Sequence, residues 1–219
     1  MFHTRKLDLL VSIYIFCIVV SELMGAKTFP LLNLGWLKLN ASVAIFVLPL
    51  IFTINDMITE VHGKERTRSI IRSGLIVIGL ILLFSILATK LPPSARFQSS
   101  EPAYDAVFGL SARISAASLI AFTLADFLDV LVFVKIKELM GKKALWFRNN
   151  ISNFASQFVD TIVFMFLAFY ALDKGFVENL VFLMGLVIPF WLLKSFMSII
   201  ETPLVYLGVR WLREDDKRQ

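Results

Sequence analysis

The sequence predicts an all-α polytopic membrane protein with six transmembrane helices and both termini in the cytoplasm. Apolar residues make up 58% of the 219 residues, and the mean hydropathy of +0.76 is well above that of an ordinary soluble domain. The apolar residues also gather in stretches of about 20 residues, the length that a helix needs to cross the hydrocarbon core. We expect one transmembrane domain over residues 1–219, placed as a multi-pass protein in the cytoplasmic (inner) membrane.

Six stretches of the chain are long and apolar enough to cross. The first follows two basic residues, but it is too long for a cleavable signal and lacks a clear cleavage site. The third has no charged residue between Ser73 and Thr89, which argues against an amphipathic helix of a soluble bundle. The six stretches cover residues 7–26, 41–59, 70–91, 114–134, 151–172 and 177–208.

Prolines interrupt the last apolar stretch and end the third one. The last stretch is too long for one straight crossing, and Pro189 and Pro203 interrupt it. Because proline removes a backbone hydrogen bond and kinks a helix, we expect a bent or tilted sixth helix. The polar connection 92–110 starts with two prolines, and we expect a surface loop there with a short helix over residues 104–109.

The distribution of basic residues sets the orientation. Fifteen of the 22 lysines and arginines fall at the amino terminus, in the second and fourth connections, or at the carboxy terminus. Because cytoplasmic connections carry the excess of lysine and arginine, these parts are expected inside the cell. The same rule accounts for the net charge of +5, so we expect no nucleic-acid partner.

Cysteine and histidine offer little chemistry. Cys17 is the only cysteine and cannot form an intramolecular disulfide. His3 and His62 have no companions at metal-ligand spacing. We therefore expect no metal site, no cofactor and no catalytic residue.

Carboxylates in or beside the apolar stretches carry most of the functional information. An ionisable group at membrane depth is costly, and it is usually retained because it faces a partner or a transport path. We expect five of these acids to share one pocket, Glu60 to assist it from a helix end, and Glu22 to stand apart on the outer side. The five are Asp56, Asp126, Asp129, Asp160 and Glu201.

Polar side chains also line up along two of the later helices. Asn150, Asn153, Gln157 and Asp160 are spaced three, four and three residues apart, which places them on one helical face. On the last apolar stretch, Lys194 begins a second series of polar side chains at helical spacing. Such a face either lines a cavity or bonds to a neighbouring helix. In the same way, Lys194 either serves the pocket or forms a structural ion pair with an acid on another helix.

Several short motifs in order along the chain resemble the VUT family of queuosine precursor transporters. Each piece is weak alone, but the ordered set with six apolar stretches is specific. The pieces are Ala26-Lys27, Asp56-x-x-Thr59-Glu60-x-x-Gly63, Arg113-Ile114-x-x-Ala117-Ser118, Leu128-Asp129-Val130-x-Val132-Phe133, Trp146-x-Arg148-Asn149-Asn150-x-Ser152, Gln157-x-x-Asp160-Thr161-x-x-Phe164 and Thr202-Pro203-x-x-Tyr206.

The resemblance implies uptake of a 7-deazaguanine compound: preQ0, preQ1 or queuine. One carboxylate can accept the two N–H groups of a guanine-like edge, amides can donate to its oxygen, and an aromatic ring can stack on its face. The substrate-binding candidates are Asp56, Glu60, Asp126, Asp129, Arg148, Asn150, Gln157, Asp160, Phe164, Lys194 and Glu201, with Glu22, Lys27 and Arg113 as further candidates.

Other functions are weighed against this one. The chain has no P-loop sequence, so a membrane subunit that needs partner ATPases is the first alternative to a secondary transporter. An intramembrane enzyme would need a nucleophile–base set, which the sequence does not show. A structural membrane protein would not need so many acids. The sequence leaves open whether protons or sodium drive uptake and whether the chain forms a homo-oligomer.

Overall fold

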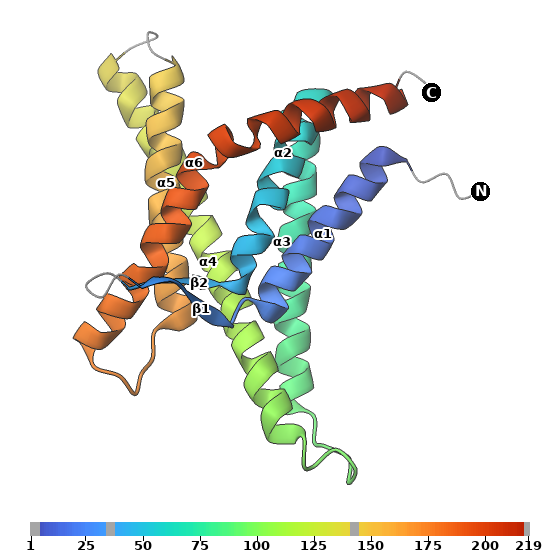
Figure 1. Cartoon of the computed structure of the whole chain (residues 1–219), viewed down its shortest axis with the longest axis vertical. Helices are drawn as coiled ribbons and strands as arrows, with labels where there is room; N and C mark the ends of the chain where they lie inside the picture. The colour runs from blue at the N-terminus through green and yellow to red at the C-terminus, as the bar shows by residue number, and fades with distance from the viewer. Residues whose placement is uncertain (1–4, 34–37, 141–144, 217–219) are drawn as a thin grey trace.

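The computed structural model describes residues 5–33, 38–140 and 145–216, without the side chains at 38, at parts of 126–140, and at 145–153, 197–202 and 214–216. It is mostly helical, at 82%, as the sequence predicts. The helices are α1 (Lys6–Met24), α2 (Leu48–His62), α3 (Lys64–Lys90), α4 (Glu101–Met140), α5 (Leu145–Phe169) and α6 (Phe176–Asp216) (Figure 1).

Five of the described helical segments are long and apolar enough to cross a membrane. They lie in α1, in the segment Val43–His62 that ends with α2, and in α3, α4 and α6. A shorter apolar segment, Phe154–Phe169, lies in α5. A multi-pass membrane protein is therefore confirmed, whereas the count of six crossings stays a prediction.

The helical connections and ends fall on two sides of the molecule. Figure 1 shows the start of α1, the turn between α2 and α3, the end of α4 and the end of α6 at the same end. Gly63 makes the α2–α3 turn with φ +82°, a backbone angle that favours glycine. The arrangement suits an even number of crossings, and the cytoplasmic orientation of this end stays a prediction.

A β-hairpin after α1 is the part of the fold that the sequence did not predict. Strand β1 (Thr28–Asn33) pairs antiparallel with β2 (Lys38–Ser42), and the register shifts between Pro30 and Leu32. The Ser42 hydroxyl donates to the Gly25 carbonyl at 2.6 Å, which fixes the hairpin to the end of α1. The predicted helical class is confirmed in its coarser form: the described part is mostly helical, with one two-stranded sheet added.

The connection between α3 and α4 is shorter than predicted. Helix α4 already begins at Glu101, so the short helix expected over 104–109 is its first part. The Tyr104 ring packs between Phe97 and Phe108, with ring centroids 5.4 and 4.4 Å away. These aromatic contacts stabilise an early helix start that the polar composition of the segment does not suggest.

Helix α6 has the bend that its prolines predict. Both Pro189 and Pro203 lie inside the helix. In Figure 1 the segment Phe176–Phe196 and the segment 203–213 run in clearly different directions. The second segment crosses the ends of α1 and α2, and Val209 and Leu212 bury their side chains there.

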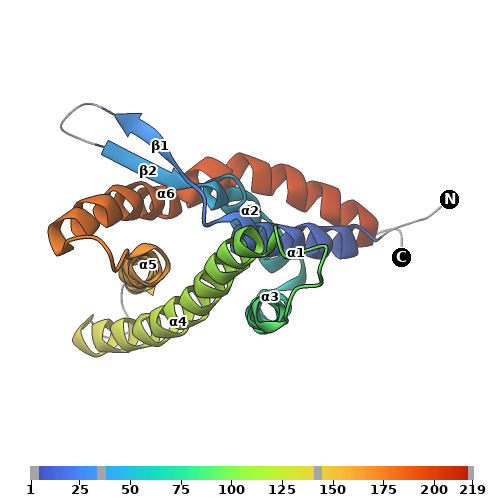
Figure 2. The same cartoon turned by 90° about the horizontal axis from the view of Figure 1, so that it is seen from below.

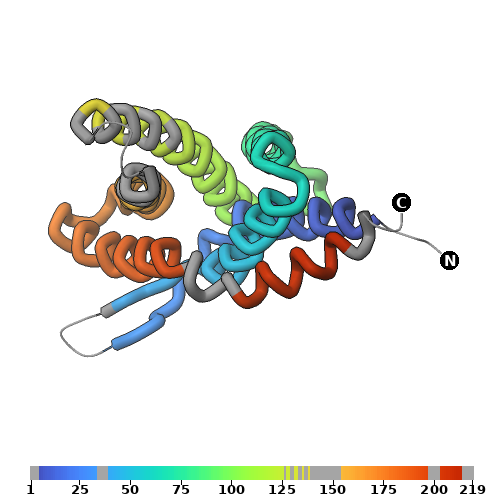
Figure 3. Tube along the Cα trace, turned by 90° about the horizontal axis from the view of Figure 1, so that it is seen from above, coloured from blue at the N-terminus to red at the C-terminus, as the bar shows by residue number. Residues whose placement is uncertain are grey.

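The two end views show how the helices are layered. Figure 2 shows α6 and the hairpin on one side and α3 and α4 on the other, with α1, α2 and α5 between them. Figure 3 shows the same order from the opposite end. Many apolar side chains of α3 are exposed, such as Leu80, Leu83 and Phe84, as expected for a helix that faces lipid.

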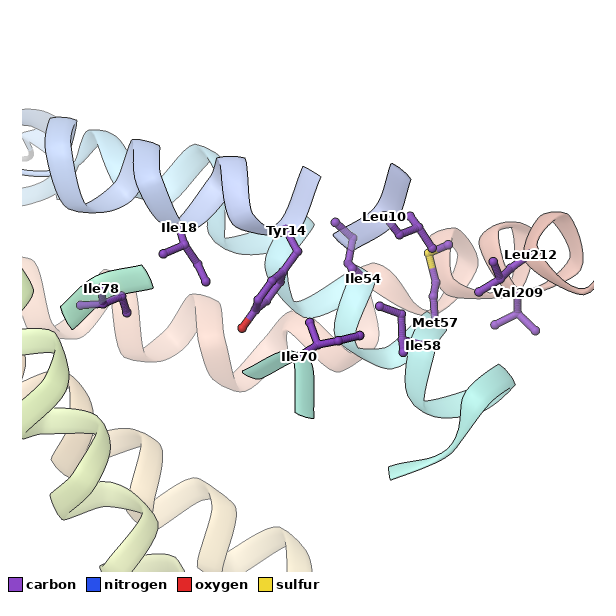
Figure 4. Packing of buried hydrophobic residues seen from close by; sticks show 10 residues of the cluster. All are labelled: Leu10, Tyr14, Ile18, Ile54, Met57, Ile58, Ile70, Ile78, Val209 and Leu212. Atoms are coloured by element: carbon purple, nitrogen blue, oxygen red, sulfur yellow. The ribbon is translucent and has the colours of Figure 1, made fainter. Parts of the chain in front are cut away.

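Three clusters of buried apolar residues hold this arrangement. The first joins α1, α2, α3 and α6 and includes Tyr14, Ile54, Met57 and Leu212 (Figure 4). The second joins β2, α5 and α6, and the third joins α4 and α5. All three clusters contribute side chains to the wall of one cavity, so the cavity is held by the main packing of the molecule.

Candidate functional site

A cavity of about 460 Å³ lies among the helices. This volume is within the range of roughly 300–1,000 Å³ that small-molecule sites occupy. All six helices and the end of β2 contribute to its wall. Its polar lining residues are Tyr14, Ser21, Glu22, Ser42, Asn55, Ser118, Ser156, Gln157, Asp160, Thr161 and Lys194.

Helical spacing explains why α1 and α4 reach this space. On α1 the lining includes Tyr14, Ile18 and Ser21, which repeat every three or four residues. On α4 the side chains of Ser118 and Phe122 are four residues apart. Residues at this spacing lie on one face of a helix, so each helix presents a stripe to the cavity.

An ion pair between α5 and α6 forms one pole of the cavity. Lys194 Nζ donates to Asp160 Oδ2 at 2.5 Å, and the two side chains are only 13% and 22% exposed. Both residues line the cavity. The pairing joins the two stripes that the sequence predicted on these helices, and it offsets much of the cost of placing either charge at this depth.

Helix α5 adds neutral polar and aromatic groups beside this pair. Gln157 and Phe164 line the cavity on either side of Asp160 along the helix. The Thr161 hydroxyl donates to the Gln157 backbone carbonyl at 2.7 Å. A ring, an amide and a charged pair are thus presented by one helix and its neighbour.

A second carboxylate lies in the cavity wall where α1 meets α4, and we call this position the α1–α4 pole. Glu22 is only 4% exposed and lines the cavity. Its Oε1 accepts the Ser118 hydroxyl at 2.9 Å, while its buried Oε2 has no hydrogen-bond partner. We expected Glu22 to stand apart on the outer side, but the structure places it in the wall of the same cavity as Asp160.

One more buried polar atom in the described lining has no hydrogen-bond partner. Asn55 Oδ1, on α2, is buried and accepts no hydrogen bond. Buried acceptors in this state are rare in folded proteins, and a bound ligand or water usually satisfies them. The cavity wall also holds the rings of Phe52, Phe122, Phe164 and Phe190, which offer flat apolar surfaces.

Some sequence-predicted site residues lie away from the cavity. Glu60 pairs with Arg213 at 3.1 Å on the surface, with both side chains more than half exposed. Arg113 donates to the Leu167 and Tyr170 carbonyls at 2.7 and 2.6 Å and thereby caps the end of α5. Two more predicted residues, Asp56 and Lys27, are exposed and are not part of the lining.

Five further candidates lie outside the described side chains. They belong to α4, α5 and α6, whose backbones approach the cavity, and their roles stay predictions. These residues are Asp126, Asp129, Arg148, Asn150 and Glu201.

Sequence reasoning missed several lining residues because they are uncharged. Tyr14 and Asn55 stand in ordinary apolar stretches, and Ser118 was noted only as part of a motif. The signal that could have found Tyr14 is its spacing of eight residues from Glu22, two turns along the same face. Among the residues whose side chains are described, no group of three histidines, cysteines or carboxylates is placed to hold a metal ion.

Comparison with known proteins finds similarity to membrane transporters. The family described as "Putative vitamin uptake transporter" matches residues 42–208. The chain is 28% identical over 203 residues to a "Probable queuosine precursor transporter" of Bacillus subtilis, covering 92% of this chain and 84% of that protein. No solved structure matches the chain significantly.

Two further relatives carry similar names. A "Probable queuosine precursor transporter" of Haemophilus influenzae is 31% identical over 153 residues, covering 69% of this chain and 61% of that protein. The "Queuosine precursor transporter" of Escherichia coli is 26% identical over 137 residues, covering 61% of this chain and 58% of that protein. Because the family match spans most of the chain and includes α2 to α5 and most of α6, this chain belongs to the vitamin uptake transporter family of membrane proteins.

Proposed function

We propose that this chain imports a queuosine precursor of the 7-deazaguanine type across the cytoplasmic membrane, and that the central cavity is its binding site. The observation that carries the proposal is the Asp160–Lys194 pair, which is largely buried and yet lines the cavity. An ion pair at membrane depth marks a substrate path more often than a structural contact. The names of the relatives supply the substrate class.

The charged pole suits the polar edge of a guanine-like base. A carboxylate accepts two adjacent N–H groups together, and Asp160 can do so for N1–H and the 2-amino group. The base oxygen requires a donor, and both Lys194 and the Gln157 amide lie in the same part of the lining. The pole therefore offers both acceptors and donors within reach of one edge.

The remaining wall suits the flat faces of such a base. Phe164 follows Asp160 by one turn of α5, and Phe52 and Phe122 enter the wall from α2 and α4. Aromatic rings stack on planar bases with a gain of about 1–3 kcal/mol for each base. A bicyclic base of this kind is small compared with about 460 Å³, so room remains for a substituent and water.

The decisive experiment measures uptake in a bacterium that can neither make nor import queuosine precursors. Each precursor is supplied separately, and queuosine in transfer RNA is the readout. We expect the wild-type chain to restore queuosine. Asp160→Asn should lower uptake by at least about tenfold, because a charge-assisted contact to the base is lost. Normal uptake by Asp160→Asn would refute the assignment of the site.

A matched control separates transport from folding. Glu178→Gln also removes the acid of an ion pair with a lysine, Lys174, but this pair is exposed and lies outside the cavity lining. It should leave uptake unchanged, and membrane levels of all variants should be compared. Rescue in a host without ATPase partners for this chain would also favour a secondary transporter over a subunit that needs them.

A further inference from the structure

The two poles of the cavity differ in how their charge is compensated. Asp160 is bonded to Lys194, whereas Glu22 accepts the Ser118 hydroxyl and has no cation beside it among the described residues that line the cavity. Among the cavity-lining residues whose side chains are described, Lys194 is the only lysine or arginine. The described lining therefore contains two carboxylates and one ammonium group, and the uncompensated carboxylate is at the α1–α4 pole.

Glu22 has one carboxylate oxygen that can still accept a hydrogen bond. Its Oε2 is buried without a hydrogen bond, and the buried Ser115 hydroxyl of the facing helix lies beside the same carboxylate. A carboxylate oxygen that is buried and unpaired is costly, so a ligand that supplies a cation there gains a strong contact.

We propose that Glu22 is the residue that selects a cationic substituent on the substrate. In this arrangement the base edge lies at Asp160, Lys194 and Gln157, and a primary ammonium group carried elsewhere on the base reaches the Glu22 carboxylate. The inference rests on the proposed function and adds a specificity-determining residue to it. Such a residue distinguishes 7-aminomethyl-7-deazaguanine (preQ1), which carries an ammonium group, from 7-cyano-7-deazaguanine (preQ0), which is neutral.

The test compares uptake of these two compounds by the wild-type chain and by Glu22→Gln. Glutamine has nearly the same shape, and its oxygen still accepts the Ser118 hydroxyl, so the substitution removes mainly the charge. We expect the specificity constant for the aminomethyl compound to fall at least about tenfold. Uptake of the cyano compound should change by less than about threefold and so serves as an internal measure of folding and insertion.

Each other outcome has a defined meaning. Equal loss of both compounds in Glu22→Gln would overturn the inference, because it would show a structural or coupling role for the carboxylate. Unchanged uptake of the aminomethyl compound would overturn it as well, as would a wild-type chain that imports only the cyano compound. If the wild-type chain imports neither compound while it is present in the membrane, the proposed function itself fails, and the inference falls with it.

Discussion

Removing one partner of the Asp160–Lys194 pair should destabilise the protein far more than breaking a surface pair. The two side chains are 22% and 13% exposed and meet at 2.5 Å. Loss of either leaves a buried charge alone, at a cost of about 3–5 kcal/mol. The Glu60–Arg213 pair is 63% and 55% exposed. Solvent screens that pair, so it should contribute only about 0–1 kcal/mol.

A double-mutant cycle measures this difference. Asp160→Asn, Lys194→Met and the double variant are purified in detergent, and their unfolding is followed by titration with SDS in mixed micelles. The double variant should lose less stability than the two single variants predict together, because no buried charge remains in it. We expect a coupling free energy of at least about 2 kcal/mol, near the upper end for contacting residues.

The surface pair provides the reference for the cycle. The same measurement on Glu60→Gln, Arg213→Met and their combination should give a coupling of less than about 1 kcal/mol. Equal coupling for the two pairs would refute the argument that burial makes the Asp160–Lys194 contact strong. Single substitutions at Asp160 or Lys194 that each cost less than about 1 kcal/mol would refute it too.

Two further predictions concern packing at the two ends of α6, and the same SDS titration checks both. Gly208 contacts Met57 so closely that an added Cβ would overlap the methionine side chain; Gly208→Val should cost about 1–3 kcal/mol, and Met57→Ala in the same chain should recover part of this. Asn179 is 3% exposed and bonds to both the amide and the carbonyl of Ala171 at 2.8 Å. Asn179→Ala should cost about 1–3 kcal/mol because it leaves these backbone groups without their partner, and no loss of stability would contradict that role.

The helices could be predicted from the sequence because each is long and apolar. The predicted stretch 7–26 nearly coincides with α1, and the stretch 70–91 covers most of α3, which begins already at Lys64. The hairpin could not be found in this way, since its strands have five or six residues and one contains a proline. Its position depends on contacts with the rest of the chain, such as the bond from Ser42 to Gly25. Short strands held by tertiary contacts leave little periodic signal.

The site could be predicted only in part, because charge marks depth but does not tell which way a helix faces. Gln157, Asp160 and Lys194 lie in the cavity wall, where the stripes on α5 and α6 led us to expect a pocket. Glu60 is also a carboxylate in a family motif, as Asp160 is, yet it pairs with Arg213 on the surface. The uncharged members of the wall, such as Asn55, become visible only when the helices are placed around a common space.

The two acids of the cavity should therefore separate stability from recognition. Asp160 has a built-in cation, so its substitution disturbs Lys194 and changes folding as well as substrate contact. Glu22 has no cation among the described residues that line the cavity, so its neutral replacement removes a cost from the empty protein while it weakens the contact to a cationic substrate. A chain that kept Glu22 only for stability would be better served by a neutral residue. On the proposed function, a cationic ligand supplies the positive charge that the described lining lacks beside Glu22.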